Sequence, residues 1–301
     1  DRCVRSCGQH RDAWGRHVPL ALPSSEAIDI ASDKAKTCRL ALKEGIRIPQ
    51  TYFPADHHEV ERLAQEDIYP CVVKIPVSTA SKGVFVVNNK QELMRLYSTR
   101  DFEGQWPIIQ RFVDGDFYGL TAVADKGEMI SGFMFSILQE HSTDGTPPWA
   151  CGEKDPVLFD IAGKIVRKLN WTGAIDFDFI KGGDSSYFLL EINPRFSGIL
   201  NFAYRLGIDL PWDYWCVSQG RPVETRAPVA GLNRKRFVTL LPAAFLWCYR
   251  NKRIVSSFLP SLFNFKDKNN LYWDDPALLF YQLRETYWNW QDVRISASKP
   301  A

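Results

Sequence analysis

Several large protein classes are excluded by what this 301-residue sequence lacks. No G-x-x-x-x-G-K-[ST] motif is present, which excludes a Walker-type phosphate loop. Neither a Ser-His-Asp arrangement nor a catalytic-cysteine arrangement is recognisable, and no internal repeat or low-complexity segment occurs. The net charge is only +2, with 37 Lys and Arg against 35 Asp and Glu. This balance argues against a nucleic-acid partner. Length and composition are typical of a soluble enzyme with one large domain or two to three lobes.

Cysteine usage and the amino terminus bear on the compartment. The seven cysteines form no C-x-x-C pair. Cys3 and Cys7 are close enough for half of a zinc site, but no matching Cys/His pair follows. No charged segment followed by an apolar one supports a signal peptide. We therefore expect free thiols and a cytoplasmic protein.

A predicted β-hairpin carries the strongest functional signal. Residues 174–180 and 187–193 alternate apolar and polar side chains around the turn-rich stretch 181–186. If the hairpin is centred between Gly183 and Asp184, Asp176 lies directly opposite Glu191. One face is then acidic, and the other is a core face made by Ile175, Phe177, Phe179, Phe188, Leu190 and Ile192.

The acidic face ends in the run Glu191-Ile192-Asn193-Pro194-Arg195. Side chains alternate along a strand, so Asp176, Asp178, Glu191 and Asn193 share one face. Pro194 ends the strand and frees Arg195. Hard oxygen ligands beside an arginine suit Mg²⁺ (or Mn²⁺) and a phosphate. An ordinary solvated sheet face is the alternative.

Two lysines are further candidates for an anion site. Lys74 ends the apolar run Cys71-Val72-Val73, and a buried ammonium needs an anionic partner. The loop 76–83 after it offers backbone N–H groups and hydroxyls, although Gly83 is its only glycine. Lys34 lies on a helix expected to begin near Ser25 and to end at Gly45. An exposed helical lysine is the alternative for Lys34.

In their order along the chain, these features resemble the ATP-grasp enzymes, closest to the carbamoyl-phosphate-synthase-like and carboxylate–amine ligase branch. The resemblance covers about two thirds of the chain and is carried by Ala31-Ser32-Asp33-Lys34, Cys71 to Gly83, Ile108 to Asp116, Gly173 to Phe177 and Glu191 to Gly198. It implies an α+β fold with two lobes gripping the nucleotide.

The resemblance also implies a division of the chain. Residues 1–24 would be the remnant of an amino-terminal domain, with its last strand near residues 17–22. Residues 25–220 would form the ATP-grasp domain, including a lid lobe at about 70–108. Residues 221–301 would be a divergent, aromatic-rich extension.

Site roles follow from the same resemblance. Lys34, Lys74, Ser81, Lys82 and Gly83 would contact the nucleotide phosphates. The segment from Gln110 through Arg111 and Phe112 to Val113 would hold adenine, and Asp116 would hold the ribose. The metal would be bound by Asp176, Glu191 and Asn193, while Lys74 and Arg195 would stabilise the charge that develops during transfer.

The activity implied is ATP-dependent C–N ligation between a small carboxylate and an amine, through an acyl phosphate, with ADP and phosphate released. A bicarbonate-using carboxylase or carbamoyl-phosphate-type enzyme is one alternative. A non-catalytic ATP-binding module is another, and its sign would be a missing metal ligand.

Beyond Gly220 the resemblance fades, and residues 221–301 hold many aromatic side chains. An apolar run covers residues 237–249 and precedes Arg250, Lys252 and Arg253; it is shorter than the roughly 20 residues that span a bilayer. Core packing is expected for it, with interfacial membrane contact the alternative. A terminal helix is expected after Asp274-Asp275-Pro276.

Overall fold

The computed structural model describes residues 2–78, 83–100, 102, 104–138, 149–223, 235–264, 268–272 and 274–297. The chain divides into two compact units. The first comprises residues 1–134, 155–197 and 210–225, and the second comprises residues 135–154, 198–209 and 226–301.

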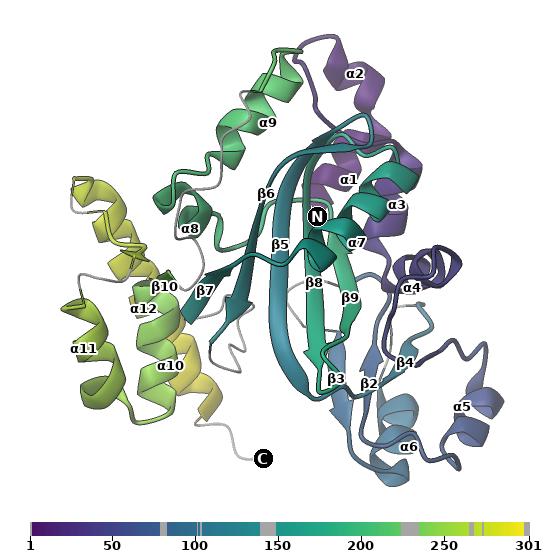
Figure 1. Cartoon of the computed structure of the whole chain (residues 1–301). Helices are drawn as coiled ribbons and strands as arrows, with labels where there is room; N and C mark the ends of the chain where they lie inside the picture. Colours follow the sequence, from purple (N-terminus) through teal and green to yellow (C-terminus); the bar gives the residue numbers. More distant parts are fainter. Residues whose placement is uncertain are drawn as a thin grey trace. The chain divides into compact units, whose positions relative to one another are not determined.

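A small antiparallel sheet forms one lobe of the first unit (Figure 1). Its strand order is β1-β4-β2-β3, with β1 at Thr51–Tyr52, β2 at Cys71–Lys74, β3 at Val84–Val87 and β4 at Ile108–Arg111. Helices α5 (His57–Leu63) and α6 (Lys90–Thr99) pack on it. Val73 and Ile109 are fully buried in this core with Val60 and Leu93 of the helices. Strands β2 and β3 therefore flank the loop that follows Lys74.

A second antiparallel sheet supplies the other lobe of the first unit (Figure 1). Strands β6, β5, β8 and β9 lie side by side in that order. The strands are β5 (Gly115–Asp125), β6 (Glu128–Ile137), β8 (Gly173–Gly182) and β9 (Tyr187–Asn193). The helices of this unit are α1 (Arg2–Gln9), α2 (Arg11–Gly15), α3 (Ser25–Ser32), α4 (Lys34–Lys43), α7 (Pro156–Lys168) and α9 (Leu210–Ser218). The main core joins the sheet to α3, α4 and α7 through residues such as Ala31, Cys38, Ile165 and Phe177.

The β8–β9 hairpin forms as predicted, but its register differs from the prediction. Asp176 pairs with Asn193 and Asp178 with Glu191, whereas Phe179 pairs with Leu189. Leu190 is therefore an extra residue, a β-bulge that the symmetric hairpin did not include. The bulge shifts the inward positions, so the core side chains of β9 are Tyr187, Leu189 and Ile192 instead of Phe188, Leu190 and Ile192.

The helix expected to run from Ser25 to Gly45 is broken in two. Asp33 has an extended backbone, with φ −116° and ψ 111°, and its carboxylate accepts from the N–H groups of Ala35 and Lys36. Asp33 thereby caps α4, while Ser24 caps α3. Such caps contribute about 1 kcal/mol each. The break makes Lys34 the first residue of α4, immediately beside the capped end.

Asn89 caps α6, because its side-chain oxygen accepts from the Glu92 N–H. One further expectation, for the amino-terminal segment, is wrong. No strand forms at residues 17–22, all of which are described; α1 and α2 precede an irregular segment there. Arg11 instead donates to the carbonyl oxygens of Leu22 and Pro23.

The second unit holds the aromatic-rich carboxy-terminal segment. Its strands are β7 (Trp149–Glu153), β10 (Arg236–Val238) and β11 (Lys268–Asn269), in the order β11-β10-β7. Its helices are α8 (Leu200–Arg205), η1 (Leu240–Ala244), α10 (Phe245–Arg250), η2 (Ile254–Phe258), α11 (Leu259–Leu262) and α12 (Pro276–Ala297). The apolar run at 237–249 lies mainly in a core that includes Leu240, Ala244 and Cys248, so core packing is confirmed. The expected terminal helix is α12.

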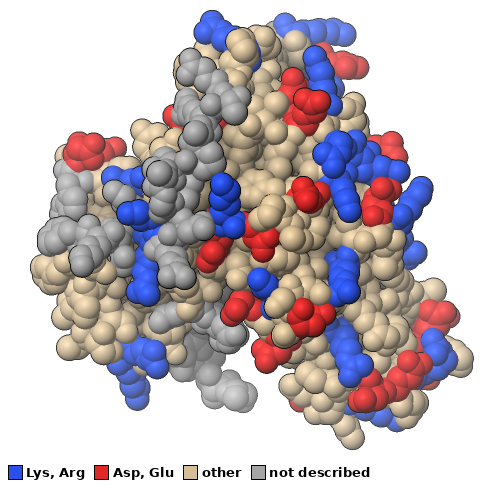
Figure 2. Space-filling view, in the orientation of Figure 1, with Lys and Arg blue, Asp and Glu red and all other residues tan. Residues whose placement is uncertain are grey.

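Two surface properties accompany this fold. Within the described part of the chain, no helix combines the length and the apolar character needed to cross a bilayer. Figure 2 shows acidic and basic side chains interspersed over the visible face of the first unit.

Candidate active site

Lys74 is buried at the end of β2, with 8% of its surface exposed. Lys74 pairs with Val84 on β3 and with Ile108 on β4, so it has a neighbouring strand on each side. Burial lowers the pKa of the Lys74 ammonium, while the nearby Glu191 opposes that shift. The ammonium makes no hydrogen bond to any residue that the structure describes. A buried cation held in this way is prepared to receive an anion.

Lys34 links the start of α4 to the acidic hairpin and to the loop after β2. Its Nζ lies 3.2 Å from a Glu191 carboxylate oxygen. The same Nζ donates to the carbonyl oxygen of Ser78 at 3.2 Å and to its hydroxyl at 3.3 Å. Its side chain is 9% exposed, so the exposed-helix alternative for Lys34 is wrong in this structure.

The acidic face of the hairpin is a set of close polar contacts. Asn193 donates through Nδ2 to Asp178 Oδ2 at 3.3 Å and accepts at Oδ1 from Arg195 Nη2 at 3.4 Å. Arg195 Nη1 lies 3.8 Å from an Asp176 oxygen. Asp176 and Asn193 are buried, whereas Asp178 and Glu191 are partly buried. The face is therefore not an ordinary solvated sheet surface.

The pKa values of the three carboxyl groups are shifted in different directions. Burial raises the pKa of Asp176, helped by Glu191 and opposed by Arg195. Withdrawal from water, together with Asp176 and Glu191, also raises the pKa of Asp178. Burial alone would raise the pKa of Glu191, but Lys34, the hydrogen bond with Asp178 and Lys74 lower it instead. Negative charge is thus concentrated at Glu191, between the two lysines.

The donor set fits a divalent cation such as Mg²⁺. Asp176, Glu191 and Asn193 present hard oxygen atoms on one face, the ligand type that Mg²⁺ prefers. Asp176 Oδ1 is buried and has no hydrogen-bond partner among the described residues, and such an atom is costly without one. Within the described ranges, no three Asp, Glu, His or Cys side chains are grouped at metal-binding spacing. Glu191 instead contacts Lys34, and Asp178 contacts Asn193.

A pH dependence of stability follows from Asp176 and Asp178. A raised carboxyl pKa means that the folded state keeps protons which the unfolded chain releases above about pH 4. Their contribution to stability is complete below that pH and is lost as the pH rises toward the folded-state values. Without added metal, the melting temperature of wild type should fall between pH 5.5 and 8 by more than that of Asp176→Asn. Equal falls in differential scanning fluorimetry would contradict this assignment.

The segment expected to hold adenine joins the two sheets of the first unit. Gln110 is buried, and its side chain donates to the Thr51 hydroxyl at 2.9 Å and to Cys38 Sγ. The N–H groups of Arg111 and Phe112 donate to the carbonyls of Gln50 and Pro70. Among the described residues, the Val113 N–H has no backbone partner of this kind.

Asp116 follows on the surface of β5, opposite Lys181. The strand begins at Gly115, where a Cβ would lie 2.0 Å from the Lys181 carbonyl oxygen, so only glycine fits this close approach. No hydrogen bond or ion pair between described residues joins the lysine and carboxylate cluster to Arg111, Phe112, Val113 or Asp116.

The loop after β2 is partly described. Gly83 accepts at its carbonyl from the Ile75 N–H at 2.8 Å. A Cβ at Gly83 would lie 2.6 Å from the Ser78 side chain and 2.9 Å from Ile75. This glycine is therefore required to close the loop. The expectations for Ser81 and Lys82 lie outside the described residues.

Three residues that contribute to the cluster were not among the predicted ligands. Asp178 shares the acidic face because it follows Asp176 by two residues, and this spacing is visible in the sequence. Ser78 accepts from Lys34, and Thr121 pairs with Asp176 from β5 and accepts from the Ser197 N–H at 3.3 Å. The last two contacts are long-range, and nothing in the sequence indicates them.

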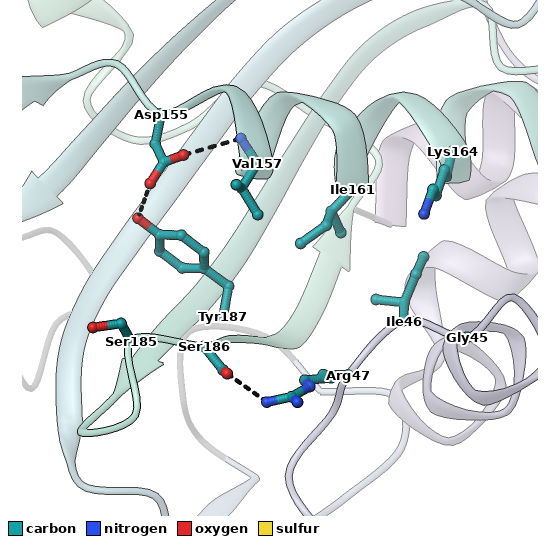
Figure 3. A pocket seen from close by; sticks show the side chains of 10 residues that line it. All are labelled: Gly45, Ile46, Arg47, Asp155, Val157, Ile161, Lys164, Ser185, Ser186 and Tyr187. Atoms are coloured by element: carbon teal, nitrogen blue, oxygen red, sulfur yellow. Dashed lines mark hydrogen bonds between the residues drawn. The ribbon is translucent and has the colours of Figure 1, made fainter.

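A separate cavity of about 330 Å³ lies in the first unit (Figure 3). Its wall comes from residues 45–47, the start of α7 and the β8–β9 turn. Asp155 accepts there from the Tyr187 hydroxyl at 2.8 Å, and Arg47 donates to Ser186. None of the candidate site residues lines it, so it belongs to the packing of α7 on the hairpin.

Comparison with known proteins identifies the family. Residues 31–199, more than half of the chain, match the family model of the ATP-grasp domain. The chain belongs to the ATP-grasp family. The expected fold class and resemblance are thereby confirmed, and the match includes the two lysines and the acidic hairpin of this ATP-grasp domain.

Relatives in sequence include carbamoyl phosphate synthase large chains. That of Xanthomonas axonopodis pv. citri is 26% identical over 200 residues, covering 62% of this chain and 18% of the relative. That of Thermoanaerobacter sp. is 28% identical over 191 residues, covering 60% of this chain and 18% of the relative. The ATP-grasp chain therefore spans less than a fifth of the length of these relatives.

Solved structures share the fold. The biotin carboxylase domain of Hydrogenobacter thermophilus 2-oxoglutarate carboxylase, crystallised with MgADP, ADP and bicarbonate, superposes with a TM-score of 0.64 at 15% identity, covering 77% of this chain and 54% of that chain. N5-carboxyaminoimidazole synthase of Aspergillus clavatus, in complex with ADP and a ribonucleotide, also gives 0.64 at 15% identity, covering 81% and 66%.

Proposed function

We propose that this ATP-grasp chain uses Mg-ATP to activate a small carboxylate as an acyl phosphate, which an amine then attacks. The observation that carries this proposal is the convergence of two lysines on the acidic hairpin, with the Lys34 ammonium 3.2 Å from Glu191 and Lys74 buried nearby. Positive and negative side chains lie close together in this cluster and are largely shielded from water. Such an arrangement suits phosphoryl transfer, in which catalysis consists largely of positioning and charge stabilisation.

Each side chain has a task in this scheme. Asp176, Glu191 and Asn193 would hold Mg²⁺, which when bound neutralises phosphate oxygens as a Lewis acid. Lys74 receives nucleotide phosphate oxygens, and Lys34 exchanges its Glu191 contact for phosphate. Arg195, with its side chain 43% exposed, faces the incoming carboxylate. The Val113 N–H would bind adenine, with Arg111 and Phe112 beside it, and Asp116 would bind the ribose.

The proposed reaction has two steps. A carboxylate oxygen attacks the γ-phosphorus, the bond to the bridging oxygen breaks, and ADP leaves. The amine nitrogen then attacks the acyl carbon, phosphate departs, and the nitrogen loses a proton. The protein contributes no covalent nucleophile, in agreement with the absence of a catalytic triad in the sequence.

A hydroxylamine assay tests this scheme. Hydroxylamine should replace the natural amine, so that a hydroxamate accumulates in proportion to ADP when the purified protein is screened with amino acids and other carboxylates. ADP and phosphate should be the nucleotide products by chromatography. AMP and pyrophosphate would indicate adenylation and contradict the proposal.

A bicarbonate-dependent reaction is the second candidate, favoured by the carbamoyl phosphate synthase relatives and by the neighbour solved with bicarbonate. Its signature is ADP formed only with bicarbonate and no hydroxamate from any acid. A non-catalytic ATP-binding module would bind nucleotide and form neither product.

A further inference from the structure

Asn193 is held at both ends of its carboxamide. Its Nδ2 donates to Asp178 Oδ2 at 3.3 Å, and its Oδ1 accepts from Arg195 Nη2 at 3.4 Å. A guanidinium only donates, so the Arg195 contact defines the near end of the amide as oxygen, and the Asp178 oxygen accepts from the NH₂ group at the other end. An amide oxygen has two lone pairs, so one remains for a second partner after Arg195 is bound.

The local fold places Asp178 for this contact. The bulge at Leu190 sets Asp178 directly opposite Glu191, and Asn193 is its diagonal neighbour across the hairpin. On the other side, Asp178 pairs with Gly119 of β5. Directly opposed residues share a face, and Gly119 has no side chain, so β5 leaves room for the Asp178 carboxyl group. If the pairing of Phe179 with Leu189 continued without the bulge, Phe177 and not Asp178 would lie opposite Glu191.

We infer that Asp178 is a positioning residue which keeps the Asn193 oxygen directed to the metal and nucleotide, without being a ligand itself. This inference rests on the proposed Mg-nucleotide site. If the amide turned over, its NH₂ group would face the cation, and a donor cannot coordinate a metal. Asp178 therefore acts through Asn193. It affects metal binding only because the two ends of the Asn193 amide differ, one being an oxygen acceptor and the other an NH₂ donor.

Two substitutions at Asp178 distinguish the orientation of the Asn193 amide from an effect of the acidic group itself. Asp178→Asn removes the acidic group but keeps an oxygen that can accept from Asn193, whereas Asp178→Ala removes both. In calorimetric titrations with Mn-ADP, Asp178→Ala should weaken binding roughly 10- to 100-fold, the usual effect of losing a group that orients a metal ligand. Asp178→Asn should stay within about threefold of wild type, on the same argument.

A second background makes the test decisive. In Asn193→Asp the side chain has oxygen at both ends, so there is no orientation left to hold. In that background Asp178→Ala and Asp178→Asn should bind Mn-ADP equally. The inference is overturned if the Ala variant still loses affinity relative to the Asn variant there, or if the two are equally impaired in the wild-type background.

Controls distinguish this inference from the proposed function. Thermal melts should show that every variant is folded at the titration temperature, and the binding of ADP without metal should be the same for all variants, which separates a metal-specific effect from unfolding. A wild-type protein whose ADP affinity does not change with Mn²⁺ would overturn the proposed metal site, and the inference with it. Metal-dependent binding that is insensitive to Asp178→Ala would overturn the inference alone.

Discussion

Replacement of Lys74 by methionine should weaken nucleotide binding by about 1.5 to 3 kcal/mol, the scale of a hydrogen bond to a charged group. Methionine keeps the unbranched apolar stem and fits the buried end of β2, but it has no ammonium for phosphate. Burial lowers the pKa of the Lys74 ammonium, which means that the folded protein holds this charge at a cost. The melting temperature of the nucleotide-free variant should therefore not fall.

Isothermal titration with Mg-ADP and a thermal melt measure the two effects separately. Lys36→Met is the matched control, because Lys36 lies on the same helix as Lys34 but is half exposed and pairs with Asp29 on the surface. Such surface pairs contribute about 0 to 1 kcal/mol, and the control should bind nucleotide normally. Unchanged affinity in Lys74→Met would remove this lysine from the nucleotide site.

The acidic hairpin illustrates how far local sequence rules reach. Side-chain alternation placed Asp176, Asp178, Glu191 and Asn193 on one face, and the observed pairing agrees. The partner of each residue was wrong for two reasons. The turn already pairs Phe179 with Leu189 instead of Phe188, and a bulge then adds one residue to one strand and leaves no distinct mark in the sequence. Leu190 is as apolar as its neighbours, so only the packing of Leu189 on Phe179 and of Tyr187 on Tyr118 identifies the inward positions.

Helix periodicity also failed to predict the break before Lys34. The apolar spacing of Ile28, Ala31, Ala35 and Cys38 continues through both α3 and α4, so it predicted a single helix. Asp33 between them is also a strong capping residue: its extended backbone ends α3, and its side chain caps the start of α4. The contact of Lys34 with Glu191 depends on a tertiary approach across 157 positions of sequence, which no local pattern specifies.

Replacement of Glu191 by glutamine should abolish turnover while the fold stays intact. Glutamine keeps the shape of the side chain but loses the charge that balances Lys34 and that would hold Mg²⁺. A bound metal supplies several kcal/mol of charge stabilisation in the transition state. At about 1.4 kcal/mol per tenfold in rate, we expect turnover to fall roughly a thousandfold or more.

The fold is expected to survive because Glu191 lies at the edge of the core, with its side chain 30% exposed, and the buried Ile192 beside it is unchanged. Circular dichroism of Glu191→Gln should match wild type. Glu44→Gln is the matched control, since it breaks a surface ion pair with Lys168 at 2.8 Å and should leave turnover unchanged. Most of the activity persisting in Glu191→Gln, measured as ADP release, would mean that the acidic hairpin is a structural face and that the proposed metal site lies elsewhere.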